Sequence, residues 1–106
     1  MKGLNRVLLI GNLVADALTK TTGDTTKTSF KLAVSRTTEN DEADFIWCGV
    51  WGERGVKLEK WLTKGRKLAI EGKLRLSSTE NEDGSFKNYT DILVDDIMFL
   101  DSNEER

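Results

Sequence analysis

Residues 45–77 read FIWCGVWGERGVKLEKWLTKGRKLAIEGKLRLS, and the spacing of their apolar side chains changes twice. Residues 45–51 alternate with the period of two that indicates a β-strand. Over residues 53–63 the apolar side chains fall at helical spacing instead, and Gly65 just beyond them suits the end of a helix. Residues 67–77 return to a period of two. The stretch therefore predicts a strand, a helix and a second strand in that order.

The remainder of the chain supplies further strands separated by turn-forming residues. Residues 6–13 (RVLLIGNL) are apolar on both parities, so we expect both faces of this strand to be covered. Residues 28–36 alternate cleanly and place Phe30, Leu32 and Val34 on the inner face. The other expected segments are a polar connection over 19–27 with its tip at Gly23-Asp24, an acidic loop over 37–44, an Asp83-Gly84 turn, a last strand over 89–94, and residues 97–100 packed behind it.

The predicted order is strand, strand, strand, helix, strand, strand, in a chain whose 106 residues suit a single domain. This is the order of the OB-fold, an all-β, five-stranded Greek-key barrel with one helix between its third and fourth strands. Within the helix, Leu58, Trp61 and Leu62 share a face, so we expect Trp61 to be a core residue. We expect one domain over residues 1–106, with a short acidic end from about residue 101 and no long C-terminal tail.

The composition argues against an enzyme. The chain has one cysteine, Cys48, and no histidine, which excludes an internal disulfide framework, a cysteine-based metal site and a histidine-dependent catalytic triad. The phosphate-binding motif Gly-x-x-x-x-Gly-Lys-Ser/Thr is also missing. We therefore expect no catalytic residues, no metal and no cofactor. The sequence contains neither a membrane-length apolar run nor a signal peptide, so we expect a soluble, cytoplasmic protein without a membrane partner.

Charge is distributed unevenly along the chain, whose formal net charge is −2. Residues 1–37 carry +4 and residues 54–75 carry +6, whereas residues 38–53 carry −5 and residues 76–106 carry −7. The local field, rather than the net charge, decides which polyanions approach a surface. The two basic segments are therefore compatible with nucleic-acid binding, although ordinary scatter of surface charge gives a similar pattern.

The strand over residues 45–51 carries the most informative side chains. Phe45, Trp47 and Trp51 share one parity, while Ile46, Cys48 and Val50 occupy the other, which suits a barrel interior. The aromatic row then faces outward, where unpaired bases stack on rings with about 1–3 kcal/mol per base and without sequence preference. For any single ring, packing under a loop or in a subunit interface is the alternative. A single-stranded nucleic acid is the ligand that suits all three.

Basic side chains are expected on the strands that flank this row. Lys31 points outward on the second predicted strand and Arg36 lies at its end, while Lys73 and Arg75 share a parity on the fourth. Cations interleaved with aromatic rings hold the phosphates of a strand whose bases stack. Each charge taken alone also suits an ordinary solvated surface.

Residues 5 to about 100 resemble the bacterial single-stranded DNA-binding proteins. The resemblance lies in short motifs that follow one another in the order and spacing of that family. They are Asn5-Arg6-Val7 leading into Ile10-Gly11-Asn12-Leu13, then Phe30-x-Leu32-Ala33-Val34, Asp44-Phe45-Ile46 to Val50-Trp51-Gly52, Leu62-x-Lys64-Gly65, Ile70-Glu71-Gly72-x-Leu74, and Asp96-x-x-x-Phe99-Leu100.

The resemblance implies a homotetramer that binds and protects single-stranded DNA, without sequence specificity, in DNA replication, recombination and repair. Such a protein is cytoplasmic and associated with the nucleoid. A first strand that is apolar on both parities suits assembly as a dimer of dimers. The resemblance places stacking aromatics at Phe45 and Trp51, a DNA-contacting residue at Trp47, and basic contacts at Arg6, Lys20 and Arg75.

The sequence departs from the family in two respects. Thr38 and Thr79 stand where members often carry a stacking aromatic, so we expect Trp47 to compensate as a base platform. The chain stops at Arg106 without the flexible, acidic-tipped segment that recruits repair proteins, so tail-mediated partners are not expected. Two other interpretations stay open. One is a dimeric, primosome-type OB adaptor protein of replication restart, and the other is an OB module that binds proteins alone.

Overall fold

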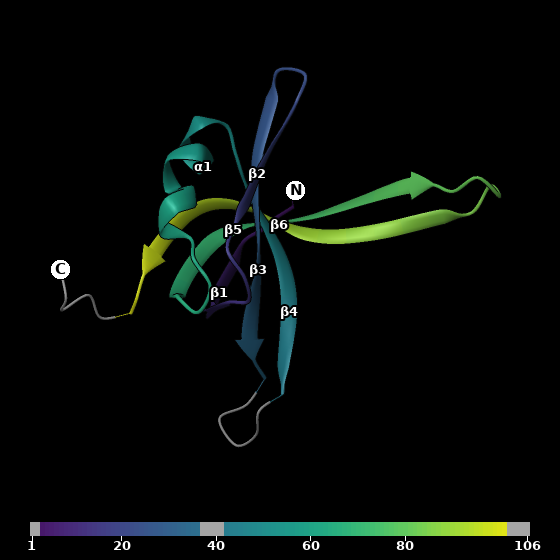
Figure 1. Ribbon diagram of the computed structural model, residues 1–106. Coiled ribbons are helices and arrows are strands. Elements are labelled where there is room, and N and C mark those ends of the chain that lie inside the picture. The colour runs from purple at the N-terminus through teal and green to yellow at the C-terminus, as the bar shows by residue number, and fades with distance from the viewer. Residues whose placement is uncertain (1–2, 37–41, 102–106) are drawn as a thin grey trace.

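The computed structural model describes residues 3–36 and 42–101, whose arrangement is shown in Figure 1. The described chain consists of strands joined by tight turns, with a short helix between the fourth and fifth strands. In chain order the elements are β1 (Val7–Leu13), β2 (Leu18–Thr22), β3 (Thr25–Ser35), β4 (Ala43–Trp51), α1 (Glu53–Leu58), the 3₁₀ turn η1 (Glu59–Trp61), β5 (Lys67–Glu80) and β6 (Phe86–Phe99).

The strands form a ring. β1 pairs antiparallel with β5, β5 with β6, and β4 with β3, while β6 runs parallel to β4. The ring closes where Asn12 and Leu13, at the end of β1, lie opposite Ala33 and Leu32 of β3. Gly11 makes this closure possible, because a side chain there would collide with the backbone of Ala33. This is the OB-fold predicted from the order of the elements.

The first strand of the predicted barrel is divided in two. β1 ends at Leu13, and after residues 14–17 the chain resumes as β2, which pairs with β3 along its whole length. The prediction of a polar connection over residues 19–27 is therefore wrong, except for its tip at Gly23, where φ is +60°. The segment is polar because the β2–β3 hairpin extends beyond the barrel, as Figure 1 shows, and has little core to cover. Its threonines nevertheless suit a strand.

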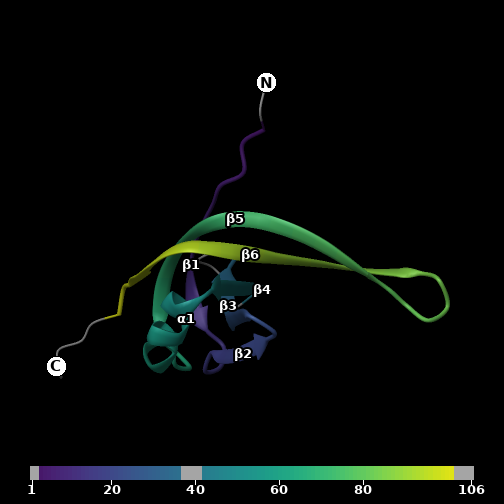
Figure 2. The same ribbon diagram turned by 90° about the horizontal axis from the view of Figure 1, so that it is seen from above.

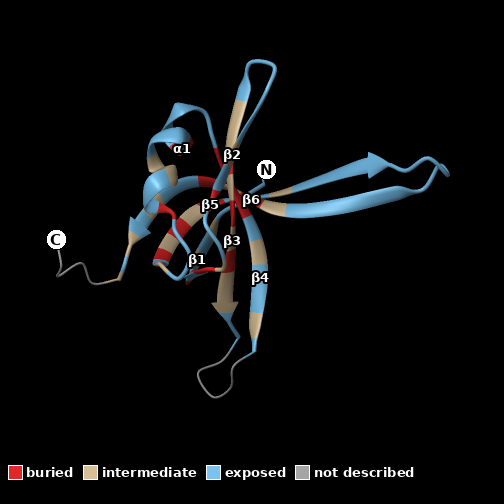
Figure 3. Ribbon diagram, in the orientation of Figure 1, coloured by how far each residue is buried: buried red, intermediate tan, exposed pale blue. Residues whose placement is uncertain are grey.

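The core lies where the strands of the ring cross (Figure 3). The alternation predicted for β3 and β4 is confirmed, since Phe30, Leu32, Cys48 and Val50 are buried. Burial, with a smaller contribution from the charge of Asp91, raises the pKa of the Cys48 thiol to about 12. The thiol therefore stays protonated and acts as a small apolar side chain. The other strands, the connection between β1 and β2, and the segment after η1 complete the core with Leu13, Ala17, Leu62, Leu68, Ile70, Ile92 and Val94.

The helical segment is shorter than predicted, and of the side chains on its predicted inner face Trp61 is not buried. α1 ends at Leu58, η1 continues to Trp61, and Leu62 then leaves helical geometry with φ −94° and ψ 74°. Leu62 is fully buried, whereas Trp61 is half exposed. The expectation that Trp61 belongs to the core is therefore wrong, because the helical spacing on which it rested ends before Leu62.

β5 extends to Glu80, slightly beyond the predicted end at residue 77, β6 is much longer than the predicted strand over residues 89–94, and the two leave the barrel together as an arm (Figures 1 and 2). A turn over residues 81–85 connects them, and Gly84 adopts φ +91° there. Leu74 and Leu76 continue the inner parity of Leu68 and Ile70 but are exposed, since the barrel no longer covers them. Residues 97–99 are part of β6 itself rather than a segment packed behind it.

Candidate nucleic-acid interface

The register between β3 and β4 places the predicted aromatic row beside lysines. Trp47 lies opposite Lys31, and Trp51 lies opposite Lys27. Phe45, near the start of β4, is 62% exposed, Trp47 is 51% exposed and Trp51 is 37% exposed. Since the residues between them in sequence point into the barrel, the strand presents its rings on the outer face. The prediction that all three rings face outward is therefore confirmed.

Each tryptophan of this row lies under a cationic group. The Nζ atom of Lys31 is 5.0 Å from the ring centroid of Trp47, and that of Lys27 is 5.1 Å from the centroid of Trp51. The guanidinium carbon of Arg75, on β5, is 5.2 Å from the same Trp51 ring. Cations at this distance are attracted by the ring's negative face. The rings and the charges of this surface therefore form one connected cluster.

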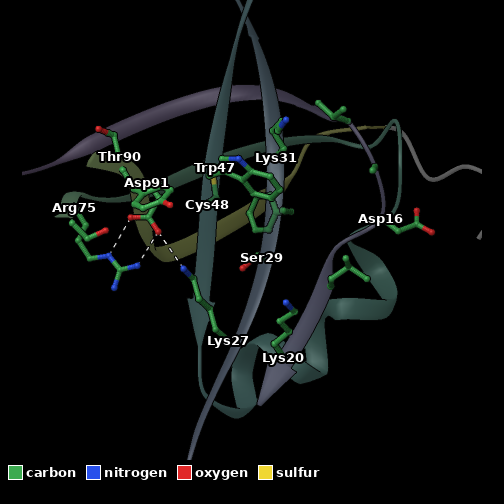
Figure 4. Close-up of a pocket in the computed structure, with 16 residues that line it drawn as sticks. Asp16, Lys20, Lys27, Ser29, Lys31, Trp47, Cys48, Arg75, Thr90 and Asp91 are labelled. Carbon is green, nitrogen blue, oxygen red and sulfur yellow. Dashed lines mark hydrogen bonds and ion pairs between the residues drawn. The ribbon is translucent and has the colours of Figure 1, made fainter. Parts of the chain in front are cut away.

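Asp91 of β6 holds two of these cations in place (Figure 4). Its Oδ2 atom accepts hydrogen bonds from Lys27 Nζ at 3.2 Å and from Arg75 Nη2 at 2.9 Å, and its Oδ1 atom accepts one from Arg75 Nε at 3.1 Å. Burial opposes ionisation, but these hydrogen bonds and charges outweigh it and hold the pKa of the Asp91 carboxyl below its ordinary value. Hydrogen bonding to Asp91 in turn raises the pKa of the Arg75 guanidinium above its ordinary value.

Gly49 provides the space in which Lys27 lies. A side chain at residue 49 would collide with the end of the Lys27 side chain, which crosses β4 between Trp47 and Trp51 on its way to Asp91. The absence of a side chain therefore lets a lysine from β3 reach an aspartate on β6. A larger residue at this position would displace the flexible end of Lys27 rather than the backbone of either strand.

A groove of about 600 Å³ runs along this surface. One side is formed by residues 14–20, which connect β1 to β2 and begin β2, and the other by the base of the β5–β6 arm. Its lining includes the rings of Trp47, Tyr89 and the buried Phe30, whereas Phe45 and Trp51, the other two rings of the predicted row, are not among the lining residues. Its basic side chains, labelled in Figure 4, come from β2 (Lys20), β3 (Lys27 and Lys31) and β5 (Arg75).

Comparison with known proteins agrees with this geometry. The model of the Single-strand binding protein family matches residues 4–100. The chain belongs to this family. The Single-stranded DNA-binding protein of Clostridium perfringens (strain 13 / Type A) is 42% identical over 101 residues, covering 93% of this chain and 67% of its own length. The protein of the same name from Clostridium tetani (strain Massachusetts / E88) is 37% identical over 103 residues, covering 92% of this chain and 71% of that protein.

A further relative differs in length. Single-stranded DNA-binding protein 1 of Clostridium acetobutylicum is 30% identical over 109 residues, which cover 96% of this chain and 98% of that protein. The chain thus spans about two thirds of the C. perfringens relative and nearly all of the C. acetobutylicum one. The family model, which matches residues 4–100, covers every strand of the ring.

Only some of the predicted basic residues lie in the groove. Arg36 lies at the far end of β3 and pairs with Asp44 at 2.9 Å, while Lys73 pairs with Asp95 at 3.4 Å. Arg6 forms an ion pair with Glu71, outside the groove. Lys20, Lys31 and Arg75 are the predicted cations that line it. Of the two positions without the family aromatic, Thr79 lies on the exposed arm and Thr38 falls outside the described residues.

Three residues of the groove were missing from the predicted set. Lys27 has the same parity as Lys31, but the predicted strand began at residue 28 and so left it in a loop. Asp91 received no role in the sequence analysis, and its partners Arg75 and Lys27 are 16 and 64 residues away in sequence. Tyr89 lies on β6 opposite Ser77. It shares its parity with Asp91, and this pattern in the sequence could have placed it on the same side of the strand.

Within residues 3–36 and 42–101, no group of three or more potential metal-ligating side chains gathers at one place. The helical segments of the same ranges are all too short and too polar to span a membrane.

Proposed function

We propose that this protein binds and protects single-stranded DNA without sequence specificity, through the groove that contains Trp47 and Lys31. The observation that carries the proposal is the close pairing of exposed rings with cations on one outer face. Proteins bind unpaired strands without sequence preference through two contributions: bases stack on exposed rings, and cations neutralise the phosphates. Membership of the Single-strand binding protein family supports it.

In this proposal, bases stack on Phe45, Trp47 and Trp51 while lysines contact the phosphates. A base that stacks on Trp47 replaces the ammonium group of Lys31 over the ring or takes the opposite ring face. The displaced lysine is then free to reach the adjacent phosphate, so that ring and cation act on successive parts of one nucleotide. Every base has a π-face, and the mechanism therefore discriminates unpaired from paired DNA rather than one sequence from another.

We further propose that the protein acts as a homotetramer, a dimer of dimers, in DNA replication, recombination and repair. Leu8 and Ile10 of β1 point away from the core and are 63% and 54% exposed. Met98 of β6, which pairs through Ala69 with Ile10, extends this apolar area. An exposed apolar row on a strand is commonly covered by the same strand of another subunit.

Titration of the intrinsic tryptophan fluorescence with oligothymidine tests the binding proposal. We expect quenching that saturates, with an affinity that falls linearly in a plot of log K against log salt, by about 0.7 per phosphate neutralised. Trp61 lies outside the groove, so a Trp61→Phe variant is expected to show a larger fractional quench than the unchanged protein. Equal affinity for duplex DNA, or no quenching at low salt, would contradict the proposal.

A further inference from the structure

Tyr89 lies on the arm, on the side that faces the groove. In the register of the hairpin, Arg75 is opposite Asp91 and Ser77 is opposite Tyr89. Residues two apart on a strand share a face, so Tyr89 shares the face of Asp91, whose carboxylate reaches Lys27 on the barrel. Tyr89 is thus placed where the arm continues the surface that carries Trp47 and Trp51.

The surroundings of Tyr89 repeat those of the two tryptophans. Its side chain lines the same groove as Trp47 and Lys31, and it is 45% exposed. The Nζ atom of Lys87 is 5.5 Å from its ring centroid, close to the distances of 5.0 and 5.1 Å at Trp47 and Trp51. A lysine over a ring occurs elsewhere, at Trp61, but that ring does not line the groove. The position in the groove is therefore the feature that singles out Tyr89.

The opposite face of the arm has a different character. Phe86 lies opposite Glu80 and has the other parity, which it shares with Leu76 of β5. Phe86 and Leu76 are 65% and 72% exposed, and among the described residues no cation is found over the Phe86 ring. The hairpin therefore separates an aromatic and basic face from an apolar one, and Tyr89 belongs to the first.

We propose that Tyr89 is a further base-stacking platform, which extends the row of rings from the barrel onto the β5–β6 arm. The inference rests on the proposed function and adds a binding residue to it. It also gives the path of the bound DNA, which runs from β4 across the groove to β6. The ligand of this site is the flat face of an unpaired base, with the Lys87 ammonium beside it for the neighbouring phosphate. The tyrosine hydroxyl has no part in the stacking.

The experiment compares Tyr89→Leu, Tyr89→Phe and Phe86→Leu in the oligothymidine titration. All three keep the tryptophans that report binding. Leucine keeps apolar bulk but removes the π-face, so we expect Tyr89→Leu to weaken binding by about 5- to 150-fold, the usual range for one stacked base. Tyr89→Phe, which keeps the ring, and Phe86→Leu, which removes a ring from the other face, are expected to bind like the unchanged protein.

Each other outcome overturns the inference. Unchanged affinity in Tyr89→Leu would show that no base stacks there, and an equal loss in Tyr89→Phe would assign the effect to the hydroxyl. An equal loss in Phe86→Leu would assign it to the arm as a whole, and a smaller mass by light scattering would assign Tyr89 to a subunit contact. A change in the salt slope of Tyr89→Leu would point to lost phosphate contacts. If the unchanged protein fails to bind oligothymidine, the proposed function itself fails.

Discussion

Arg75 and Asp91 lie directly opposite each other on β5 and β6, and Arg75 donates hydrogen bonds of 3.1 and 2.9 Å to the two carboxylate oxygens. The same carboxylate accepts a hydrogen bond from Lys27 of β3. Asp91 thereby connects the base of the arm to the barrel and keeps two cations near Trp51. A negative charge at the centre of a surface proposed to bind a polyanion is explained by this positioning role.

The Asp91→Asn variant is expected to lose stability at neutral pH and to lose part of its pH dependence. Because the pKa of Asp91 is lowered in the folded protein, its ionised form stabilises the fold above the unfolded-state pKa of about 3.9. That contribution disappears as the pH falls through the lower, folded-state pKa. Because asparagine weakens the hydrogen bonds to Arg75 and Lys27, we expect Asp91→Asn to lower the free energy of unfolding by about 1–3 kcal/mol.

Urea unfolding at pH 7 and at pH 3 measures both effects of the Asp91 substitution. The matched control is Asp95→Asn, which removes a carboxylate of the same strand that pairs with Lys73 at a more exposed position. We expect the difference in stability between the two pH values to be smaller in Asp91→Asn than in Asp95→Asn. Equal differences would contradict the positioning role of Asp91.

Trp51→Ala and Phe45→Ala are each expected to weaken binding of oligothymidine by about 1–3 kcal/mol, because each removes one stacking surface. The outer positions of both rings allow the fold to persist, which circular dichroism checks. Trp61→Ala is the control, since it removes an exposed tryptophan of η1, away from the row of rings on β4, and is expected to leave affinity unchanged. Normal affinity in both Trp51→Ala and Phe45→Ala would argue against the outer row as the binding surface.

Trp47→Ala separates base stacking from subunit contact. If Trp47 compensates for the aromatics missing at Thr38 and Thr79, the variant loses about 1–3 kcal/mol of affinity and keeps its oligomeric mass. Its place in the groove under Lys31 supports this expectation. Light scattering and titration of the same sample are the measurements. Smaller species that bind DNA normally would show that Trp47 belongs to an interface instead.

Ile10→Glu tests the proposed assembly. A charged side chain on the exposed row of β1 cannot be covered by an apolar partner surface without a large desolvation cost. We expect the unchanged protein to be a tetramer at micromolar concentration and the variant to sediment or scatter as a smaller species. Lys31→Glu, on the opposite functional surface, is the charge-changing control and should keep the mass. A monomeric unchanged protein would remove the basis of the assembly proposal, and a stable dimer would favour the adaptor interpretation.

Local patterns in the sequence were enough to predict every strand except β2, the helix after β4 and the side of β4 on which the rings lie. Alternation with a period of two depends only on neighbouring residues, so Phe30, Leu32, Cys48 and Val50 were assigned correctly to the core. The order of elements then selected the barrel, since few topologies accommodate it. The motifs shared with the family led to the same fold and to the same surface.

Positions where a local pattern stops were predicted poorly. Trp61 was assigned to the core because helical spacing was extended past the point at which Leu62 leaves the helix. The polar segment over residues 19–27 lacks an apolar alternation, since the β2–β3 hairpin has little core to cover, and so it was not recognised as strand. The length of the arm was missed for the same reason, because exposed strands carry little hydrophobic pattern.

Which charges belong to the groove was decided by tertiary structure alone. The sequence determined that lysines and arginines accompany an aromatic row, but Lys73 and Arg36 turn out to be engaged by Asp95 and Asp44 outside the groove. Lys27 enters it because Gly49 leaves room and Asp91, 64 residues away, accepts its hydrogen bond. Such partners depend on the register between strands distant in sequence, and a register is set by the packing of the whole ring rather than by any one segment.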